Sequence, residues 1–160
     1  MTISVGDKLP EATLVEMTAD GPTPRTTADI FGGRKVAIFS VPGAFTPTCS
    51  AKHLPGFVDQ ADAFKAKGVD EIACMAVNDA FVMGAWGKDQ NAGGKVSMLA
   101  DGNGDFVKAL GLELDGTGFG MGLRGQRFSM IVEDGTVTTL NIEGPGEFQV
   151  SSADHMLTQL

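Results

Sequence analysis

Residues 36–57, VAIFSVPGAFTPTCSAKHLPGF, contain the pattern that decides the fold of this chain. Residues 36–41 are almost entirely apolar and rich in β-branched side chains, which predicts a strand buried on both faces in the middle of a sheet. A turn that begins at Pro42 ends this strand, and helical character then extends over residues 51–67. We therefore expect a central strand and a helix joined by the threonine-rich segment before Cys49.

Cys49 follows Thr46-Pro47-Thr48, residue types that are common at helix N-caps and first helical positions. It is therefore expected in the first turn of the helix, which we predict to kink at Pro55-Gly56. An ordinary thiol, with a pKa of about 8.5, is only about 3% ionised at pH 7, and the thiolate is the nucleophilic form. A reactive cysteine at this place needs a source of positive charge.

The helix end alone supplies too little of that charge. A helix N-terminus contributes at best ~2 kcal/mol, whereas lowering the pKa of a thiol by two to three pH units requires roughly 2.7 to 4 kcal/mol. Arg124 and Arg127 are the candidate cations. Arg127 opens a predicted strand, where sheet packing holds a side chain, whereas Arg124 lies between glycines in a predicted loop. Because a fixed guanidinium stabilises a thiolate better than a mobile one, the pattern favours Arg127.

Pro42, Thr46 and Cys49 reproduce the P-x-x-x-T-x-x-C signature of peroxiredoxins, and VPGAFTPTCSAKHLPGF resembles the type II, or fifth, peroxiredoxin subfamily. The resemblance covers nearly the whole chain, through GVDEIACMAVNDAFVMGAWGKD, LADGNGDFVKALGLELD, GLRGQRFSMIVEDGTV and GEFQVSSADHMLTQL. It implies a thioredoxin-like fold, with a mixed central sheet flanked by helices, that reduces hydroperoxides. It also implies that Cys49 is the peroxidatic cysteine and that Arg127 is the catalytic arginine of the R-F-S-M pattern.

The remaining chain is consistent with that fold class. Further strands are predicted over residues 12–17, 71–77, 96–100, 127–133 and 136–143, and further helices over residues 80–88, 105–110 and 152–159. Asp134-Gly135 is the strongest hairpin signal, and residues 1–34 are otherwise irregular. Strands that alternate with helices and then end in a hairpin and a last helix predict an α/β fold with a mixed sheet. A length of 160 residues fits one domain, residues 1–160.

Composition narrows the possible partners and the compartment. The net charge of −8 and the absence of Lys/Arg clusters argue against a nucleic-acid or membrane partner. The N-terminal residues lack the features of a signal or transit peptide, and no stretch approaches the length of a membrane span. The two cysteines form neither a disulfide framework nor a zinc pattern. We therefore expect a cytoplasmic protein with reduced thiols.

Two motifs point to cofactors that we do not expect. Residues 120–125, GMGLRG, match G-x-G-x-x-G but precede a predicted strand, so a flexible loop is the better interpretation. Residues 101–112 begin like a calcium loop but have Phe106 and Leu112 where glycine and glutamate are needed, so a turn with a helix cap is the better interpretation. No metal, haem or flavin is implied.

Three residues around Cys49 have alternative roles. Thr46 is either only an N-cap or also a hydroxyl that holds a peroxide oxygen beside the sulfur, and the resemblance favours the second role. Pro42 is expected to shape the turn and to shield the site from water. His53 lies four residues past Cys49 on the same predicted helical face, and a hydrogen-bonded packing role is favoured over a catalytic one.

The main functional hypothesis is a thiol peroxidase that reduces hydrogen peroxide and organic hydroperoxides through a sulfenic acid on Cys49. The resemblance suggests a homodimer recycled by glutathione, glutaredoxin or thioredoxin. The alternative is a peroxide-sensing redox switch or chaperone-like protein in which oxidation of Cys49 changes assembly. A general disulfide oxidoreductase is disfavoured because Thr46 stands where a Cys-x-x-Cys motif needs its first cysteine.

Cys74 leaves two interpretations open. Many relatives carry a resolving cysteine near the C-terminus, but residues 146–152 contain none. Cys74 matches a position that plant-type members use, yet it lies in the predicted buried strand of residues 71–77. Because a disulfide needs Cα atoms about 4.4 to 6.8 Å apart, resolution by Cys74 would require local unfolding. A packing role is therefore favoured over a resolving role.

Overall fold

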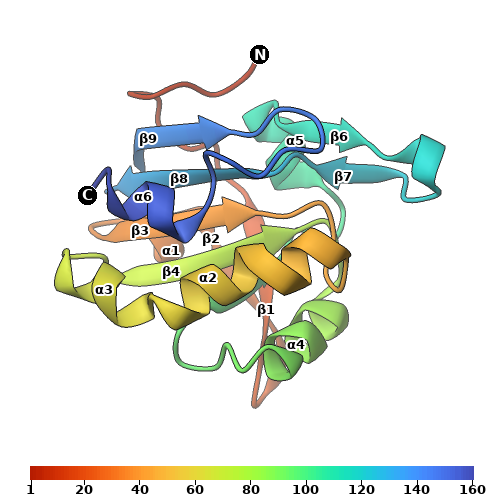
Figure 1. The fold of residues 1–160 in the computed structure, drawn as a ribbon, viewed down its shortest axis with the longest axis horizontal. Coiled ribbons are helices and arrows are strands. Elements are labelled where there is room, and N and C mark those ends of the chain that lie inside the picture. The colour runs from red at the N-terminus through yellow and green to blue at the C-terminus, as the bar shows by residue number, and fades with distance from the viewer.

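The computed structural model describes residues 1–160, and its centre is a seven-stranded sheet with the order β2-β1-β5-β4-β3-β8-β9 (Figure 1). Its strands are β1 (Thr13–Thr18), β2 (Gly21–Thr26), β3 (Lys35–Ser40), β4 (Glu71–Ala76), β5 (Ser97–Ala100), β8 (Phe128–Glu133) and β9 (Thr136–Ile142). β3, β4 and β5 are parallel, while β1 and β8 pair antiparallel to the two edges of that group. The predicted mixed sheet is confirmed.

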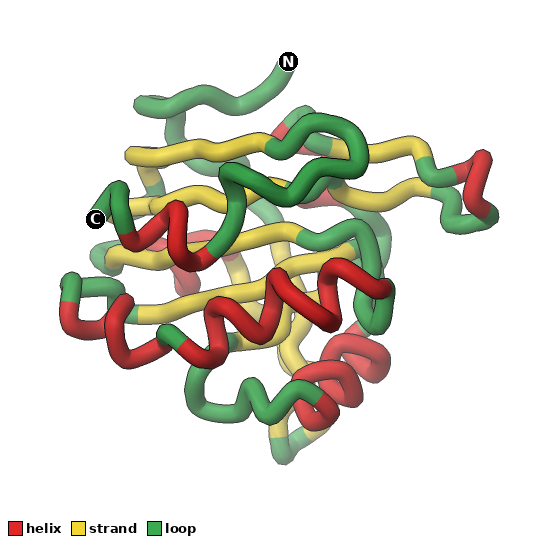
Figure 2. The backbone as a smooth tube through the Cα atoms, in the orientation of Figure 1, coloured by secondary structure: helices red, strands yellow, loops and turns green.

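Helices cover both faces of this sheet (Figures 1 and 2). One face carries α2 (Leu54–Asp59), α3 (Ala61–Ala66), α4 (Ala80–Asp89) and α6 (Ala153–Leu157), and the other carries α1 (Thr27–Phe31) and α5 (Asp105–Leu110). Each group of helices packs on its own apolar cluster, of 23 and 17 buried residues. The predicted thioredoxin-like arrangement, with helices flanking a mixed sheet, is confirmed.

The central position of β3 follows directly from its sequence. Ala37 and Phe39 belong to the cluster under α2, whereas Val36 and Ile38 belong to the cluster on the opposite face. All four side chains are fully buried, as expected when both faces of a strand are covered. The β8–β9 hairpin turns at Asp134 and Gly135, which both have positive φ, as that dipeptide predicts.

The helix predicted over residues 51–67 with a kink at Pro55-Gly56 is wrong in its details. A π-helical turn η1 (Cys49–His53) leads into α2, and the break falls at Gln60, between α2 and α3. The backbone N–H of Leu54 donates to the carbonyl of Cys49, which makes this turn wider than an α-helical one. Pro55 lies in the first turn of α2, where a missing N–H costs little, and so it does not kink the chain.

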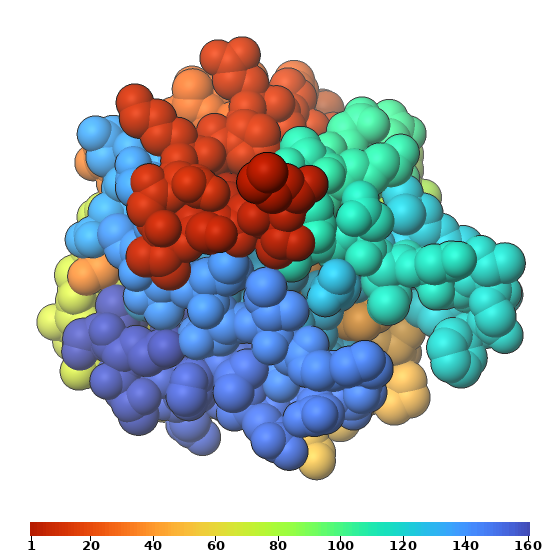
Figure 3. Space-filling model, turned by 90° about the horizontal axis from the view of Figure 1, so that it is seen from above, coloured from red at the N-terminus to blue at the C-terminus, as the bar shows by residue number.

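Residues 1–34 contain more regular structure than the sequence indicates. β2 carries two prolines and lies at the edge of the sheet, the only place where a strand tolerates them well. α1 is a single turn capped by the hydroxyl of Thr26. The N-terminal residues lie against α5, where Ile3 donates a backbone hydrogen bond to Leu110 (Figure 3).

The flexible loop predicted over residues 120–125 is wrong, because those residues belong to a hydrogen-bonded segment, residues 113–125. They form a two-stranded ribbon of β6 (Glu113–Asp115) and β7 (Leu123–Gly125), joined through the 3-10 turn η2 (Thr117–Phe119). The ribbon projects from the body of the molecule (Figures 1 and 3). Arg124 therefore lies in a strand, contrary to its predicted place in a loop. None of the helices combines the length and the apolar character that crossing a bilayer requires.

Candidate active site

Cys49 lies where the chain leaves β3 and enters the helical segment that begins at Pro47. Its predicted place in the first helical turn is confirmed. The side chain is fully buried, and its Sγ accepts a hydrogen bond from Nη2 of Arg127 at 3.1 Å. A guanidinium next to sulfur favours the charged thiolate over the neutral thiol.

Thr46 lies on the loop that precedes this turn. Its hydroxyl donates to the carbonyl of Gly43 at 2.7 Å and accepts no hydrogen bond from a backbone N–H of the first helical turn, so it does not cap the helix, contrary to one of the two predicted roles. Its backbone carbonyl accepts from the N–H of Ser50 and so begins the helical ladder. Because the hydroxyl proton is already used, the oxygen is left with its lone pairs as an acceptor for another molecule.

Arg124 lies against the Pro42 turn. Its Nε donates to the carbonyl of Met121 at 2.9 Å, and its Nη1 lies 3.4 Å from the carbonyl of Pro42. A Cβ added at Gly43 would lie 3.1 Å from both the Arg124 guanidinium and the Thr46 methyl group, so a larger residue there would have to displace these side chains. Arg124 therefore braces the loop that precedes the cysteine.

Arg127 directly precedes β8 and is held from three sides. One nitrogen, Nη2, faces Cys49, and the other, Nη1, lies 2.8 Å from Nδ1 of His53. The guanidinium carbon lies 5.8 Å from the centre of the Phe148 ring, within range of a cation–π contact. The fixed cation that the sequence favours is thus in contact with the sulfur.

His53 is the residue whose importance the sequence understates. It is fully buried, and Nε2 lies 2.9 Å from the carbonyl of Ser151. Burial, followed by the positive charge of Arg127, lowers the pKa of His53 to about 3. The ring is therefore neutral at physiological pH. In the sequence, the spacing of four residues from Cys49 is the only signal that His53 lies at this site.

We expect His53 to make the folded protein sensitive to acid. Since an unfolded histidine has a pKa near 6.5, the unfolded chain binds a proton between about pH 6.5 and 3 that the folded chain does not. The free energy of unfolding should therefore fall as the pH is lowered, by about 2 kcal/mol from this group between pH 7 and 5. Urea unfolding at several pH values measures it.

Two histidine variants separate this contribution from those of other groups. His53→Gln should lose stability less steeply than wild type between pH 7 and 5. His155→Gln, which replaces the other histidine, half-buried on α6, is the matched control. Equal pH dependence in wild type and His53→Gln would show that His53 is not held neutral by the fold.

Cys74 lies on β4 between Phe39 of β3 and Met98 of β5. Its side chain is fully buried and belongs to the same apolar cluster as Cys49, and both cysteines are free thiols. Burial, and then the charge of a Cys49 thiolate, raise the pKa of Cys74 well above its ordinary value. A thiol in this state is a poor nucleophile.

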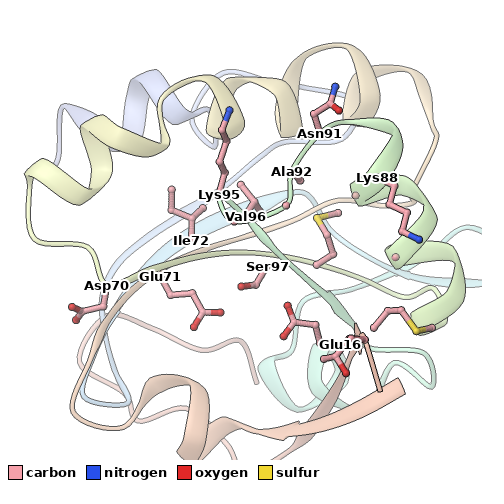
Figure 4. A pocket seen from close by; sticks show the side chains of 18 of the residues that line it. Glu16, Asp70, Glu71, Ile72, Lys88, Asn91, Ala92, Lys95, Val96 and Ser97 are labelled. Carbon is pink, nitrogen blue, oxygen red and sulfur yellow. The ribbon is translucent and has the colours of Figure 1, made fainter. Parts of the chain in front are cut away.

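A large cavity lies away from Cys49. It has a volume of about 990 Å³ and opens between α3, α4 and the starts of β4 and β5 (Figure 4). Its acidic side includes Glu71, which already pairs with Arg25 at 2.8 Å and Arg34 at 2.7 Å. Pro42, Thr46, Cys49 and Arg127 are all absent from its lining. No group of three or more His, Cys, Asp or Glu side chains is placed to hold a metal ion.

The chain is similar to peroxiredoxins both in sequence and in structure. The family described as Redoxin matches residues 4–157. Peroxiredoxin-2B of Arabidopsis thaliana is 47% identical over 159 residues, which cover 99% of this chain and 98% of the relative. Peroxiredoxin-2E-2, chloroplastic, of Oryza sativa subsp. japonica is 51% identical over 164 residues, covering 99% and 73%. Among solved structures, reduced Prx3 of Vibrio vulnificus in complex with H₂O₂ has a TM-score of 0.95, with 54% identity and 99% coverage of both chains.

A buried thiol at a helix start, hydrogen-bonded to a guanidinium on a thioredoxin-like sheet, is typical of thiol-based redox enzymes. The family match specifies the class further. The chain belongs to the Redoxin family. Within that family it is a type II peroxiredoxin, a thiol peroxidase with an antioxidant role.

Proposed function

We propose that Cys49, Thr46, Arg127 and Pro42 form the site at which this peroxiredoxin reduces hydroperoxides. The Cys49 thiolate attacks the terminal oxygen of the hydroperoxide, and a sulfur–oxygen bond forms as the O–O bond breaks. The electron pair of the O–O bond leaves on the second oxygen, which takes up a proton to become water or an alcohol. Cys49 is left as a sulfenic acid.

The contact between Arg127 and Cys49 carries this proposal. A cation 3.1 Å from the sulfur stabilises the attacking thiolate, and it remains close as negative charge moves onto the leaving oxygen. The Thr46 hydroxyl, whose proton is engaged by Gly43, accepts a hydrogen bond from the terminal O–H of the substrate. Pro42 shapes the turn beneath it and limits the access of water.

Both hydrogen peroxide and organic hydroperoxides are proposed as substrates. The Vibrio vulnificus relative in complex with H₂O₂ supports the first. For organic hydroperoxides, the support is that the reaction needs only the terminal O–O–H group to reach Cys49. Turnover with hydrogen peroxide and with an alkyl hydroperoxide tests both proposals, and activity with neither would refute them.

For the reductant, we propose glutathione with glutaredoxin, or thioredoxin, attacking the Cys49 sulfenic acid directly. The burial of Cys74 and its raised pKa favour an external thiol over an internal one. β4 is hydrogen-bonded on both sides, so moving Cys74 to Cys49 would break the centre of the sheet.

Replacing Cys74 with serine should therefore leave catalysis largely intact. Cys74→Ser is expected to keep at least half of the wild-type turnover with glutathione and glutaredoxin. Mass spectrometry of the peroxide-treated wild type in the presence of glutathione should show a glutathione adduct on Cys49. A dominant Cys49–Cys74 disulfide, together with loss of turnover in the variant, would overturn this proposal.

We also propose that residues 1–160 form a single domain that assembles as a homodimer in the cytoplasm. Two exposed phenylalanines support the dimer: Phe45, which is 52% exposed and lies four residues before Cys49, and Phe81 on α4, which is 67% exposed. Phe45 has a φ of 64°, an unfavourable conformation for a bulky residue, and it lies beside Trp86 of α4. Sedimentation of wild type and Phe45→Ser tests the dimer, which a monomeric wild type would refute.

The proposed cytoplasmic location is supported by the two free thiols, which favour a reducing compartment.

A further inference from the structure

Glu143 is a buried carboxylate immediately after β9, and the reaction described above does not use it. Its side chain accepts hydrogen bonds from the backbone N–H groups of Gln149, Val150 and Ser151 and from the hydroxyl of Ser151, at 2.6 to 2.9 Å. Burial raises the pKa of Glu143, but these hydrogen bonds outweigh that effect and hold the pKa below its usual value. The loop of residues 144–151 is thus folded around a charged carboxylate.

This loop fixes the tautomer and the orientation of His53. Ser151 donates two hydrogen bonds to Glu143, one from its backbone N–H and one from its hydroxyl. The carbonyl of the same residue lies 2.9 Å from Nε2 of His53. An arginine donates but never accepts, so Nδ1 of the neutral ring must accept from Nη1 of Arg127. The single ring proton is therefore on Nε2 and is donated to Ser151.

The same loop contacts the guanidinium a second time. The ring of Phe148 lies 4.9 Å from the ring of His53 and 5.8 Å from the guanidinium carbon of Arg127. Both contacts depend on the path that the chain takes between Glu143 and Ser151. A continuous chain of interactions leads from the Glu143 carboxylate to the Cys49 sulfur.

We propose that Glu143 is a positioning residue for peroxide reduction, which holds the loop of residues 144–151 so that His53 and Phe148 aim Arg127 at Cys49. This inference rests on the proposed role of Arg127. Glu143 touches neither substrate nor sulfur. Because small displacements of an aligned group can cost on the order of a hundredfold in rate, a remote carboxylate can control the reaction in this way.

Two variants of Glu143 and one control test the proposal. Glu143→Ala removes all the acceptors, whereas Glu143→Gln keeps one carbonyl oxygen. Glu147→Gln removes one negative charge from the exposed side of the same loop and is the matched control. Stopped-flow oxidation by hydrogen peroxide gives the rate constant, and ultraviolet absorbance gives the fraction of Cys49 present as thiolate at pH 7.

We expect Glu143→Ala to lower the rate constant roughly ten- to a hundredfold and to reduce the thiolate fraction. Glu143→Gln should lie between Glu143→Ala and wild type, and Glu147→Gln should match wild type. If Glu143→Ala does not fold, Glu143→Gln alone carries the comparison. Wild-type rate and thiolate fraction in folded Glu143 variants would overturn the inference.

A double variant distinguishes a positioning role from general loss of structure. If Glu143 acts through Arg127, adding Glu143→Gln to Arg127→Gln should slow the reaction by no more than about twofold beyond Arg127→Gln alone. If the two substitutions slowed the reaction independently, so that their separate fold-losses multiplied in the double variant, the inference would be overturned. If the proposed active site itself were wrong, Cys49→Ser would keep its peroxidase turnover. That result is distinct from a failure of the inference about Glu143. The double-variant result is the decisive one.

Discussion

Cys49→Ser is expected to have no peroxidase turnover above background. A serine hydroxyl is not ionised at neutral pH, so the variant lacks the nucleophile that attacks the O–O bond. Cys74 cannot replace it, because that thiol is buried within β4 and its pKa is raised. Consumption of hydrogen peroxide with glutathione and glutaredoxin measures the loss.

Cys74→Ser is the matched control for this experiment, since it makes the same chemical change at the other cysteine. It should remain active under the same conditions. If purified Cys49→Ser kept more than a small fraction of wild-type turnover, the peroxidatic role would belong to another residue.

Arg127→Gln is expected to lower both the thiolate fraction of Cys49 at pH 7 and the rate of peroxide reduction. The wild-type guanidinium donates to the sulfur, and a hydrogen bond to a charged group contributes about 1.5 to 3 kcal/mol, which corresponds to roughly ten- to a hundredfold in rate. The variant also leaves Nδ1 of His53 without its donor. Thiolate absorbance and stopped-flow oxidation measure the two effects.

Arg124→Gln makes the same change three residues earlier. Arg124 binds the carbonyls of Met121 and Pro42, so its loss should loosen the loop and affect the rate less than the loss of Arg127 does. An unchanged thiolate fraction in Arg127→Gln, or a larger effect in Arg124→Gln, would mean that the wrong cation has been assigned.

The parts of the fold that the sequence predicts well have local signals. β3 and β4 are continuous apolar runs buried on both faces, and the β8–β9 hairpin has Asp134 and Gly135 at its turn. The helix starts likewise depend on nearby residues, such as Asp79, which caps α4 through the N–H of Val82. These features follow from residues close together in sequence, so pattern alone is enough to find them.

The parts that the sequence misses depend on distant contacts. β2 contains two prolines and is a strand only because β1 pairs with it. The ribbon of β6 and β7 has glycines that suggest a loop, and its pairing is formed across η2. The break at Gln60 has no local signal as strong as Pro55, which the first turn of α2 accommodates without a kink.

The candidate site likewise combines residues that a local motif identifies with residues that only distant contacts reveal. Cys49, Thr46 and Pro42 lie within one motif, and Arg127 could be chosen because it opens the predicted strand of residues 127–133. The partners of His53 could not be found in this way, since Ser151 lies 98 residues later in the chain and Arg127 lies 74 residues later. Glu143 resembles an ordinary acidic residue at the end of a strand until the loop that folds around it is seen.

The most direct test of the account is the number of peroxide molecules that each protein molecule consumes in an NADPH-coupled assay. Hydrogen peroxide and an alkyl hydroperoxide would each be offered with glutathione and glutaredoxin, and separately with thioredoxin. We expect sustained turnover with at least one donor, far beyond one peroxide per protein, that disappears in Cys49→Ser. Consumption that stops at about one equivalent with every donor would contradict the account and would indicate a redox switch instead.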